Sequence, residues 1–186
     1  IRGKGNGVRQ GIAVRQSTNG GIAVIVTSAE RAKDLKQPSV NIIGWGQGHP
    51  GNREDRTINT GAAMSGRLAM EMAGVTLGDI DIRQIYDCFT YTTLITLEDY
   101  GYCNKGEGGT AFSGGRLGPK GDLPTNTGGG QLSSYYMWGM TPISEAIIQA
   151  RGQAGERQVD KHELTLVSGN GGVLQYHASL VLSSTV

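Results

Sequence analysis

Residues 82–100 read IRQIYDCFTYTTLITLEDY and join two elements of different type, a pattern that decides the fold class. The opening residues 82–86 are rich in isoleucine and tyrosine, which favour a short strand. Residues 90–100 place Leu94 and Leu97 at helical spacing and predict a helix. A strand that runs almost directly into a helix is typical of layered α/β domains.

The sequence before this stretch alternates between apolar runs and helical patterns. Residues 21–26 (GIAVIV) and 40–45 (VNIIGW) are predicted to be strands. Ser28 is a candidate N-cap for a short helix over 29–35, and a longer helix is predicted over 57–72.

Beyond this stretch the pattern changes to a long connection and a closing pair of strands. Residues 101–130 are glycine-rich with little regular pattern, and a loop of that length inside a domain is usually functional or disordered. A helix is predicted over 133–151. Two strands, over 164–167 and 173–182, are joined by 168–172 as a hairpin-type turn. Together these elements predict an α/β domain with a mixed five-stranded sheet.

The composition is that of one compact globular domain. Of 186 residues, 37% are hydrophobic and 18% are charged, and the formal net charge of +1 comes without a block of like charges. We therefore expect neither a nucleic-acid partner nor a membrane-surface partner. The 31 glycines follow no Gly-X-Y period, which indicates many turns and close backbone contacts.

The two cysteines, Cys88 and Cys103, are too few for a disulfide scaffold, which favours a cytoplasmic protein. They are not spaced as zinc ligands and the histidines are dispersed, so we expect no metal. No apolar run reaches the ~18 residues that a membrane span needs. Because the chain opens with Ile1 instead of Met, we expect an incomplete chain or one with segments missing.

Three short motifs follow one another along the chain: YDCFT at 86–90, NTGGG at 126–130 leading to Tyr135 and Tyr136, and SGNGG at 168–172. In order and spacing they resemble the C-terminal half of the thiolase superfamily. There the first motif reads NEAFA. The second is Asn-x-x-Gly-Gly followed by Gly-His-Pro, and the third is Cys-x-Gly-Gly-Gly.

The resemblance covers nearly the whole chain. It implies a thiolase-like C-terminal domain over residues 19–186 and leaves residues 1–18 as an unplaced segment. We expect the full protein to pair two such halves and, as thiolase-fold proteins commonly do, to form a homodimer.

The motifs depart from the thiolase pattern at the positions that carry the chemistry. Tyr86 stands where thiolases keep the Asn that holds a water in the oxyanion hole, Tyr136 replaces the His, and Ser168 replaces the acid/base Cys. Claisen chemistry needs a thiolate and a base that works near neutral pH, and a phenol with a pKa near ~10 does not simply replace imidazole. The nucleophilic Cys of thiolases lies in the half that this sequence lacks, which argues against thiolase activity.

The runs YDCFTY (86–91) and LSSYYMWG (132–139) resemble the thiolase-like aldolases of bacterial steroid side-chain degradation, also called lipid-transfer proteins. The resemblance implies retro-aldol cleavage of a β-hydroxy acyl-CoA, as in cholesterol catabolism, to a ketone and a short acyl-CoA. It also implies a DUF35 (OB-fold and zinc-ribbon) partner in a hetero-oligomer. No cofactor is expected beyond the CoA that the substrate carries.

A retro-aldol reaction removes a proton from a tertiary alcohol, breaks a C–C bond and reprotonates a thioester enolate. A phenol can donate or accept a proton. One of Tyr86 and Tyr136 can therefore be the base and the other the acid, if their environments separate their pKa values. The position of the family histidine favours Tyr136 as the base. Backbone amides of the glycine-rich motifs can stabilise the enolate oxygen.

The candidate catalytic residues are thus Tyr86 and Tyr136, whose hydroxyls must converge on one cleft. Candidate substrate-binding residues come from the three motifs and from the Gly48-His49-Pro50 triplet; they are Asp87, Asn126, Gly128, Gly129, Gly130, Ser168, Gly169, Gly171 and His49. Asp87 either orients a hydroxyl or caps the helix that follows it.

Simpler interpretations compete with these roles. Tyrosines near strand ends are often buried and hydrogen-bonded locally, and Tyr91 or Tyr135 can be a pocket wall or the true acid. Cys88 is most simply a small buried side chain, and His177 is most simply structural.

Two other functions stay open. One is a non-catalytic thiolase-like protein that binds acyl-CoA or lipid or scaffolds a partner. The other is an acyl-CoA thiolase or acetyltransferase whose nucleophile lies outside this chain.

Overall fold

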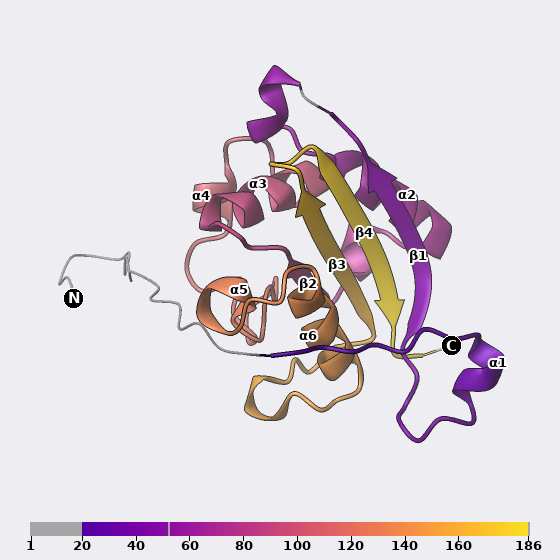
Figure 1. Cartoon of the computed structure of the whole chain (residues 1–186). Helices are drawn as coiled ribbons and strands as arrows, with labels where there is room; N and C mark the ends of the chain where they lie inside the picture. The colour runs from indigo at the N-terminus through magenta and orange to yellow at the C-terminus, as the bar shows by residue number, and fades with distance from the viewer. Residues whose placement is uncertain (1–19, 52, 186) are drawn as a thin grey trace.

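The computed structural model describes residues 20–51 and 53–185, and the unplaced segment 1–18 lies outside them (Figure 1). The strands are β1 Asn41–Gly48, β2 Ile82–Ile85, β3 Leu164–Gly171 and β4 Tyr176–Ser183. The α-helices are α1 Ala29–Ala32, α2 Ala62–Ala73, α3 Thr90–Tyr100, α4 Gly108–Ala111, α5 Gly130–Ser133 and α6 Met140–Ala150. Short 3-10 turns are η1 Glu54–Thr57, η2 Leu77–Asp79 and η3 Gly155–Arg157. No helix in this described part is long and apolar enough to cross a membrane.

The strands form one mixed sheet in the order β1-β4-β3-β2, with β2 parallel to β3 and the other pairs antiparallel. The mixed sheet confirms the prediction, but the predicted fifth strand is wrong. Residues 21–26 form no strand, and Ile25 and Val26 are 80% and 77% exposed. An apolar run becomes a strand only where a neighbour completes its backbone hydrogen bonds. No segment among the described residues pairs with this run.

Three predicted helices have different limits in the structure, and the one predicted over 29–35 ends at Ala32. The helix predicted to begin at residue 57 begins at Ala62, after η1. The helix predicted over 133–151 is instead α5 and α6, separated by the irregular segment 134–139. Trp138 in that segment has a φ of 54°, a left-handed conformation that a continuous α-helix cannot contain.

The hairpin turn predicted at 168–172 lies further along the chain, at 172–175. The glycine-rich motif does not end the strand, because β3 stays paired with β4 as far as Gly171. In the turn, Val173 and Leu174 have φ angles of 53° and 66°. Successive positive φ angles are what a short hairpin connection needs to match the twist of its strands, although they strain a β-branched residue.

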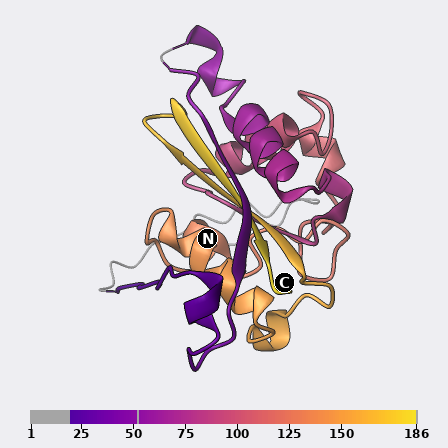
Figure 2. The same ribbon diagram turned by 90° about the vertical axis from the view of Figure 1, so that its right-hand side faces the viewer.

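The helices cover both faces of the sheet, so the domain has three layers (Figure 2). The larger core cluster lies between the sheet and α2 with α3, and includes Ala69, Leu97 and Leu166. The smaller cluster lies under α6 and includes Ala146 and Val167. Neighbouring strand residues point to opposite faces, which is why β3 contributes to both clusters.

Three glycines at alternate positions of β1 let the backbone of α2 lie directly on the strand. A Cβ on Gly46 would lie 2.2 Å from the carbonyl oxygen of Ser65. Gly44 and Gly48 would meet other carbonyl oxygens of α2 and its N-cap at 2.0 and 2.2 Å. Only glycine allows so close an approach.

A hydrogen-bonded network of hydroxyls and one imidazole is buried between the sheet and helices α2 and α3. The Tyr100 hydroxyl lies 2.7 Å from Ser179 Oγ and 3.3 Å from His177 Nε2. Ser168 Oγ lies 2.7 Å from His177 Nε2, and Ser65 Oγ lies 2.7 Å from Ser179 Oγ. Burial lowers the pKa of His177 to about 4 and raises the pKa of Tyr100 to about 12, so both are uncharged at neutral pH.

The contact between β1 and α2 can be tested with Gly46→Ala in the full-length protein. We expect the free energy of unfolding to fall by about 3 kcal/mol, because the strand or the helix must shift to admit the methyl group. Gly109→Ala is the control: a Cβ there meets open space, so no loss of stability is expected. Denaturant titration measures both, and an unchanged midpoint for Gly46→Ala would contradict the close contact.

The buried imidazole predicts a pH dependence of stability. The folded-state pKa of His177, about 4, lies below its ordinary value of 6.5, so the unfolded chain binds a proton that the folded protein does not. The stabilising contribution is therefore complete above pH 6.5 and is lost as the pH falls toward 4. We expect a loss of about 2 kcal/mol between pH 7 and pH 5. His177→Gln should show a flatter dependence, and parallel curves for the two proteins would refute the assignment.

Candidate active site

Tyr86 follows β2 directly, and its hydroxyl oxygen lies 3.1 Å from that of Tyr136 on the segment between α5 and α6. The Tyr86 side chain is only 7% exposed. Its backbone N–H donates to the carbonyl of Ser168 at 3.0 Å, so β3 holds the residue where β2 ends. The Tyr136 ring is half-buried and lies edge-on to Trp138, with 6.3 Å between ring centroids. Two segments far apart in sequence thus bring their phenols into direct contact.

Both tyrosines line a pocket of about 670 Å³, a size common for small-molecule sites. Its walls come from the end of β1, the start of α3, residues 136–139 and the β3–β4 turn. Most of the lining surface is apolar. The pocket is therefore mostly apolar and has two phenol hydroxyls in its wall.

The two phenols differ in burial, because Tyr86 is buried and Tyr136 is half-buried. Burial raises the pKa of Tyr86 well above its ordinary value, and the hydrogen bond to Tyr136 raises it further. The nearby Cys88 and Asp87 act in the same direction. Tyr86 is therefore protonated at neutral pH and can serve as a proton donor.

Side-chain contacts tie the end of β2 to the loop that leads to α5. Asn126 Oδ1 accepts the N–H of Ile85 at 2.7 Å. The buried Asp87 carboxylate accepts the N–H groups of Gln131 at 2.8 Å and Leu132 at 3.4 Å. Asp87 thus binds the first turn of α5, and neither of the two roles considered from sequence describes this contact. Asn126 and Asp87 lie outside the lining of the tyrosine pocket.

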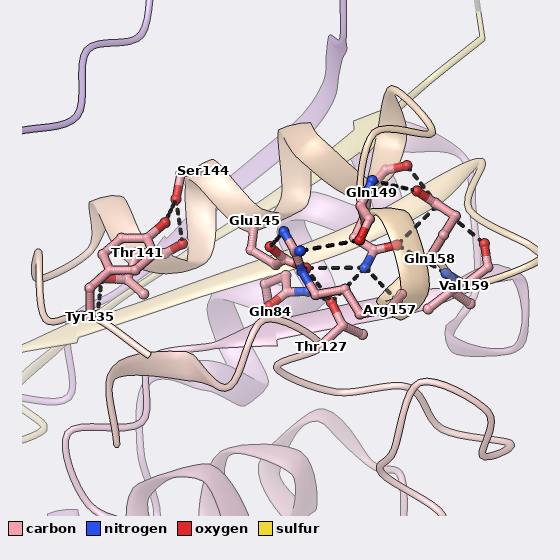
Figure 3. Close-up of polar contacts among 11 residues, drawn as sticks. Gln84, Thr127, Tyr135, Thr141, Ser144, Glu145, Gln149, Arg157, Gln158 and Val159 are labelled. Carbon is pink, nitrogen blue, oxygen red and sulfur yellow. Dashed lines mark hydrogen bonds and ion pairs between the residues drawn. The ribbon is translucent and has the colours of Figure 1, made fainter. Parts of the chain in front are cut away.

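A second buried carboxylate fixes the same loop from the side of α6 (Figure 3). Glu145 accepts two hydrogen bonds of 3.0 Å from Arg157 and one of 2.9 Å from the hydroxyl of Thr127. Gln84 of β2 and Gln149 of α6 donate to the same hydroxyl oxygen, at 2.9 and 3.0 Å. The network therefore joins β2, the loop that carries Thr127, and α6.

Two of the three glycines at 128–130, around the start of α5, face these carboxylates. A Cβ on Gly128 would lie 2.8 Å from Glu145 Oε2, and one on Gly130 would lie 2.2 Å from Asp87 Oδ2. Gly129 donates its N–H to the carbonyl three residues earlier, at 2.8 Å. We expected these glycines to bind substrate, but the structure places none of the three in the lining of the tyrosine pocket.

Other predicted residues are divided between the pocket and the core. Gly169, Gly171 and His49 line the pocket, and no atom lies within 4 Å of the Cβ positions of the two glycines. His49 Nε2 lies 3.2 Å from Gln47 Oε1. Ser168 is buried, bonds His177 in the network between the sheet and helices α2 and α3, and does not line the pocket. A role in substrate binding stays a prediction for each of them.

Of the two alternative tyrosines, only Tyr91 lines the pocket, and its hydroxyl donates to the carbonyl of Thr57 at 2.6 Å. The Tyr135 hydroxyl bonds Ser144 on α6 and lies outside the lining (Figure 3). The Tyr135 hydroxyl therefore faces α6 and not the pocket that Tyr86 and Tyr136 line.

Sequence reasoning missed several wall residues. Trp138, Val173 and Leu174 line the pocket, and all three have positive φ angles. Trp138 and Val173 are also 71% and 74% exposed. The glycine-rich motif at 168–172 was a usable signal, because residues beside a tight turn often carry function.

Comparison with known proteins adds family evidence. Residues 47–184 match the family described as thiolase C-terminal domain-like. The chain is 35% identical over 164 residues to the 17-hydroxy-3-oxo-4-pregnene-20-carboxyl-CoA lyase of Mycobacterium tuberculosis, an alignment that covers 84% of this chain and 42% of that protein. It is 34% identical over 170 residues to the acetyl-CoA acetyltransferase of Methanothermobacter thermautotrophicus, with 86% and 44% covered.

Among solved structures, the Ltp2-ChsH2(DUF35) aldolase matches with a TM-score of 0.75 and 32% sequence identity, covering 83% of this chain and 42% of that chain. This chain therefore spans less than half the length of the relatives it matches. The family match includes β2, β3, β4 and both tyrosines. The chain belongs to the thiolase C-terminal domain-like family, and its relatives include steroid side-chain aldolases and acetyl-CoA acetyltransferases.

Proposed function

We propose that this chain carries the acid and the base of a carbon–carbon lyase that cleaves a β-hydroxy acyl-CoA, of the steroid side-chain type, by a retro-aldol reaction. The observation that supports this most is the 3.1 Å contact between the hydroxyls of Tyr86 and Tyr136 in a mostly apolar pocket. Retro-aldol cleavage needs positioned proton transfer and no covalent intermediate, and two adjacent phenols can supply it.

The reaction balances without a second reactant. The base removes the proton of the β-hydroxyl, whose O–H electrons form the new carbonyl of the ketone. The bond between the α and β carbons breaks, and its electron pair becomes the thioester enolate. The enolate carbon then takes a proton from the acid, which yields the short acyl-CoA.

The environments of the two phenols suggest their roles. The raised pKa of Tyr86 suits an acid that holds its proton until the enolate forms. Tyr136 is then the base, and its hydroxyl lies 3.1 Å from that of Tyr86, within hydrogen-bond distance. The same hydrogen bond offers a path for the proton to return between turnovers.

The proposal extends to the whole protein. The likeness to a structure named as an Ltp2-ChsH2(DUF35) aldolase supports a DUF35 partner. We propose a dimer of the thiolase-like subunit within such a hetero-oligomer in the cytoplasm, with residues 19–186 as one domain. Gly169, Gly171 and His49 would contact substrate from the pocket wall.

An acyl-CoA acetyltransferase is the second candidate, because one relative carries that name at 34% identity. Its chemistry would need a nucleophilic thiolate from outside this chain and a base other than imidazole at the position of Tyr136.

A third candidate is a protein that only binds acyl-CoA or lipid. It would use the apolar pocket without using the two phenol hydroxyls.

We expect Tyr136→Phe and Tyr86→Phe each to lower kcat by about 10²- to 10⁴-fold, because each removes a proton-transfer group. Tyr135→Phe is the matched control, since its hydroxyl lies outside the pocket, and its activity should be near wild type. Ketone and acyl-CoA release are followed by chromatography on the full complex. Full activity in both pocket variants, with acyl-CoA binding intact, would favour the binding protein.

The lyase and the acetyltransferase differ in their need for free CoA. We expect cleavage of a 3-hydroxy acyl-CoA to proceed at full rate without added CoA and to yield one ketone for each acyl-CoA. A rate proportional to free CoA, with two thioester products from a 3-oxoacyl-CoA, would contradict the lyase proposal.

A further inference from the structure

Tyr136 is carried by a segment that has no regular backbone structure. Residues 134–139 connect α5 to α6, and the φ of 54° at Trp138 prevents the two helices from joining. Neither a helical nor a strand hydrogen-bond pattern fixes the backbone at Tyr136. Tyr86, in contrast, is held at its backbone by β3. The separation of the two phenols therefore depends on whatever else fixes this segment.

One side chain bonds the backbone on both sides of Tyr136. The Thr141 hydroxyl accepts the N–H of Met137 at 2.9 Å and donates to the carbonyl of Tyr135 at 3.1 Å. Thr141 is only 3% exposed, so water does not compete for these bonds. Figure 3 shows Thr141 beside Tyr135 at the start of α6.

Thr141 is itself well anchored. It lies in the first turn of α6, and the Ser144 hydroxyl donates to its carbonyl at 2.9 Å. One turn further along, Glu145 joins α6 to the buried network with Arg157 and Thr127. The position of Tyr136 is thereby set by a helix that packs on the sheet.

We propose that Thr141 is a positioning residue that holds Tyr136 within hydrogen-bond reach of Tyr86, an inference that rests on the proposed function. The side chain must donate and accept at once, because it faces one N–H and one carbonyl. A hydroxyl does both, whereas the isosteric valine does neither. A displacement of about 1 Å at a catalytic group can cost on the order of 10²-fold in rate.

The test compares Thr141→Val with Thr141→Ser in the full complex. Valine keeps the shape and should lower kcat by about 10- to 100-fold, with the KM for acyl-CoA nearly unchanged because Thr141 lies outside the pocket lining. Serine restores the hydroxyl and should restore kcat to near wild type. Equal losses in the two variants, or a change in KM alone, would overturn the proposal.

Tyr135→Phe is the matched control, because it removes a hydroxyl from the same segment and leaves both bonds of Thr141 to that segment in place. Its kcat should equal that of the wild type. If Thr141→Val does not fold, Thr141→Ala removes the same hydroxyl with less bulk and carries the same expectation.

A crystal structure of the valine or alanine variant separates this inference from the proposed function. We expect the Tyr86 and Tyr136 hydroxyls, 3.1 Å apart in the wild type, to move beyond hydrogen-bond distance. An unchanged separation would overturn the role of Thr141 whatever the activity. A wild-type protein that cleaves no β-hydroxy acyl-CoA would remove the lyase proposal, and the displacement would still establish what Thr141 positions.

Discussion

The hydrogen bonds from the first turn of α5 to the buried carboxylate of Asp87 are the interaction on which the candidate site depends. Asp87 directly follows Tyr86, and α5 leads within a few residues to Tyr136. One carboxylate therefore ties the backbones that carry both phenols. It also accounts for Gly130, where any side chain would overlap the carboxylate oxygens. Charge-assisted bonds of this kind are strong, and removing one partner leaves a buried charge uncompensated.

Glu145 fixes the other side of the same loop, and the two carboxylates together make a rigid frame behind the pocket. The ion pair with Arg157 and the bond from Thr127 hold α6 against the loop. Gly128 is required there because a Cβ would approach the Glu145 carboxylate. Glycines that resemble a ligand cradle in sequence are thus needed for close packing against buried acids. This frame orders the segments that carry the phenols, although none of its residues lines the pocket.

The wall of the pocket is built differently from the frame behind it. Trp138, Val173 and Leu174 all line the pocket with positive φ angles. Such conformations cost energy and persist only where the surrounding structure over-determines them, and they cluster at functional sites. The β3–β4 pairing imposes the strain in the turn, and the start of α6 imposes it at Trp138. The frame orders the phenols, while these strained connections shape the space in front of them.

Sequence alone determined the alternation of strands and helices, the mixed sheet, the family, and the choice of Tyr86 and Tyr136 as the residues to examine, because periodicity and motif order are local properties. Only the tertiary structure decided that 21–26 forms no strand, since pairing requires a neighbour that no pattern within the run reveals. It also decided which glycine motif faces the pocket. The NTGGG and SGNGG motifs look alike as text, but one packs against Asp87 and Glu145 while the other borders open space. The physical reason is that a glycine in the sequence does not show what lies beside it, because its neighbours in space are residues distant in the chain.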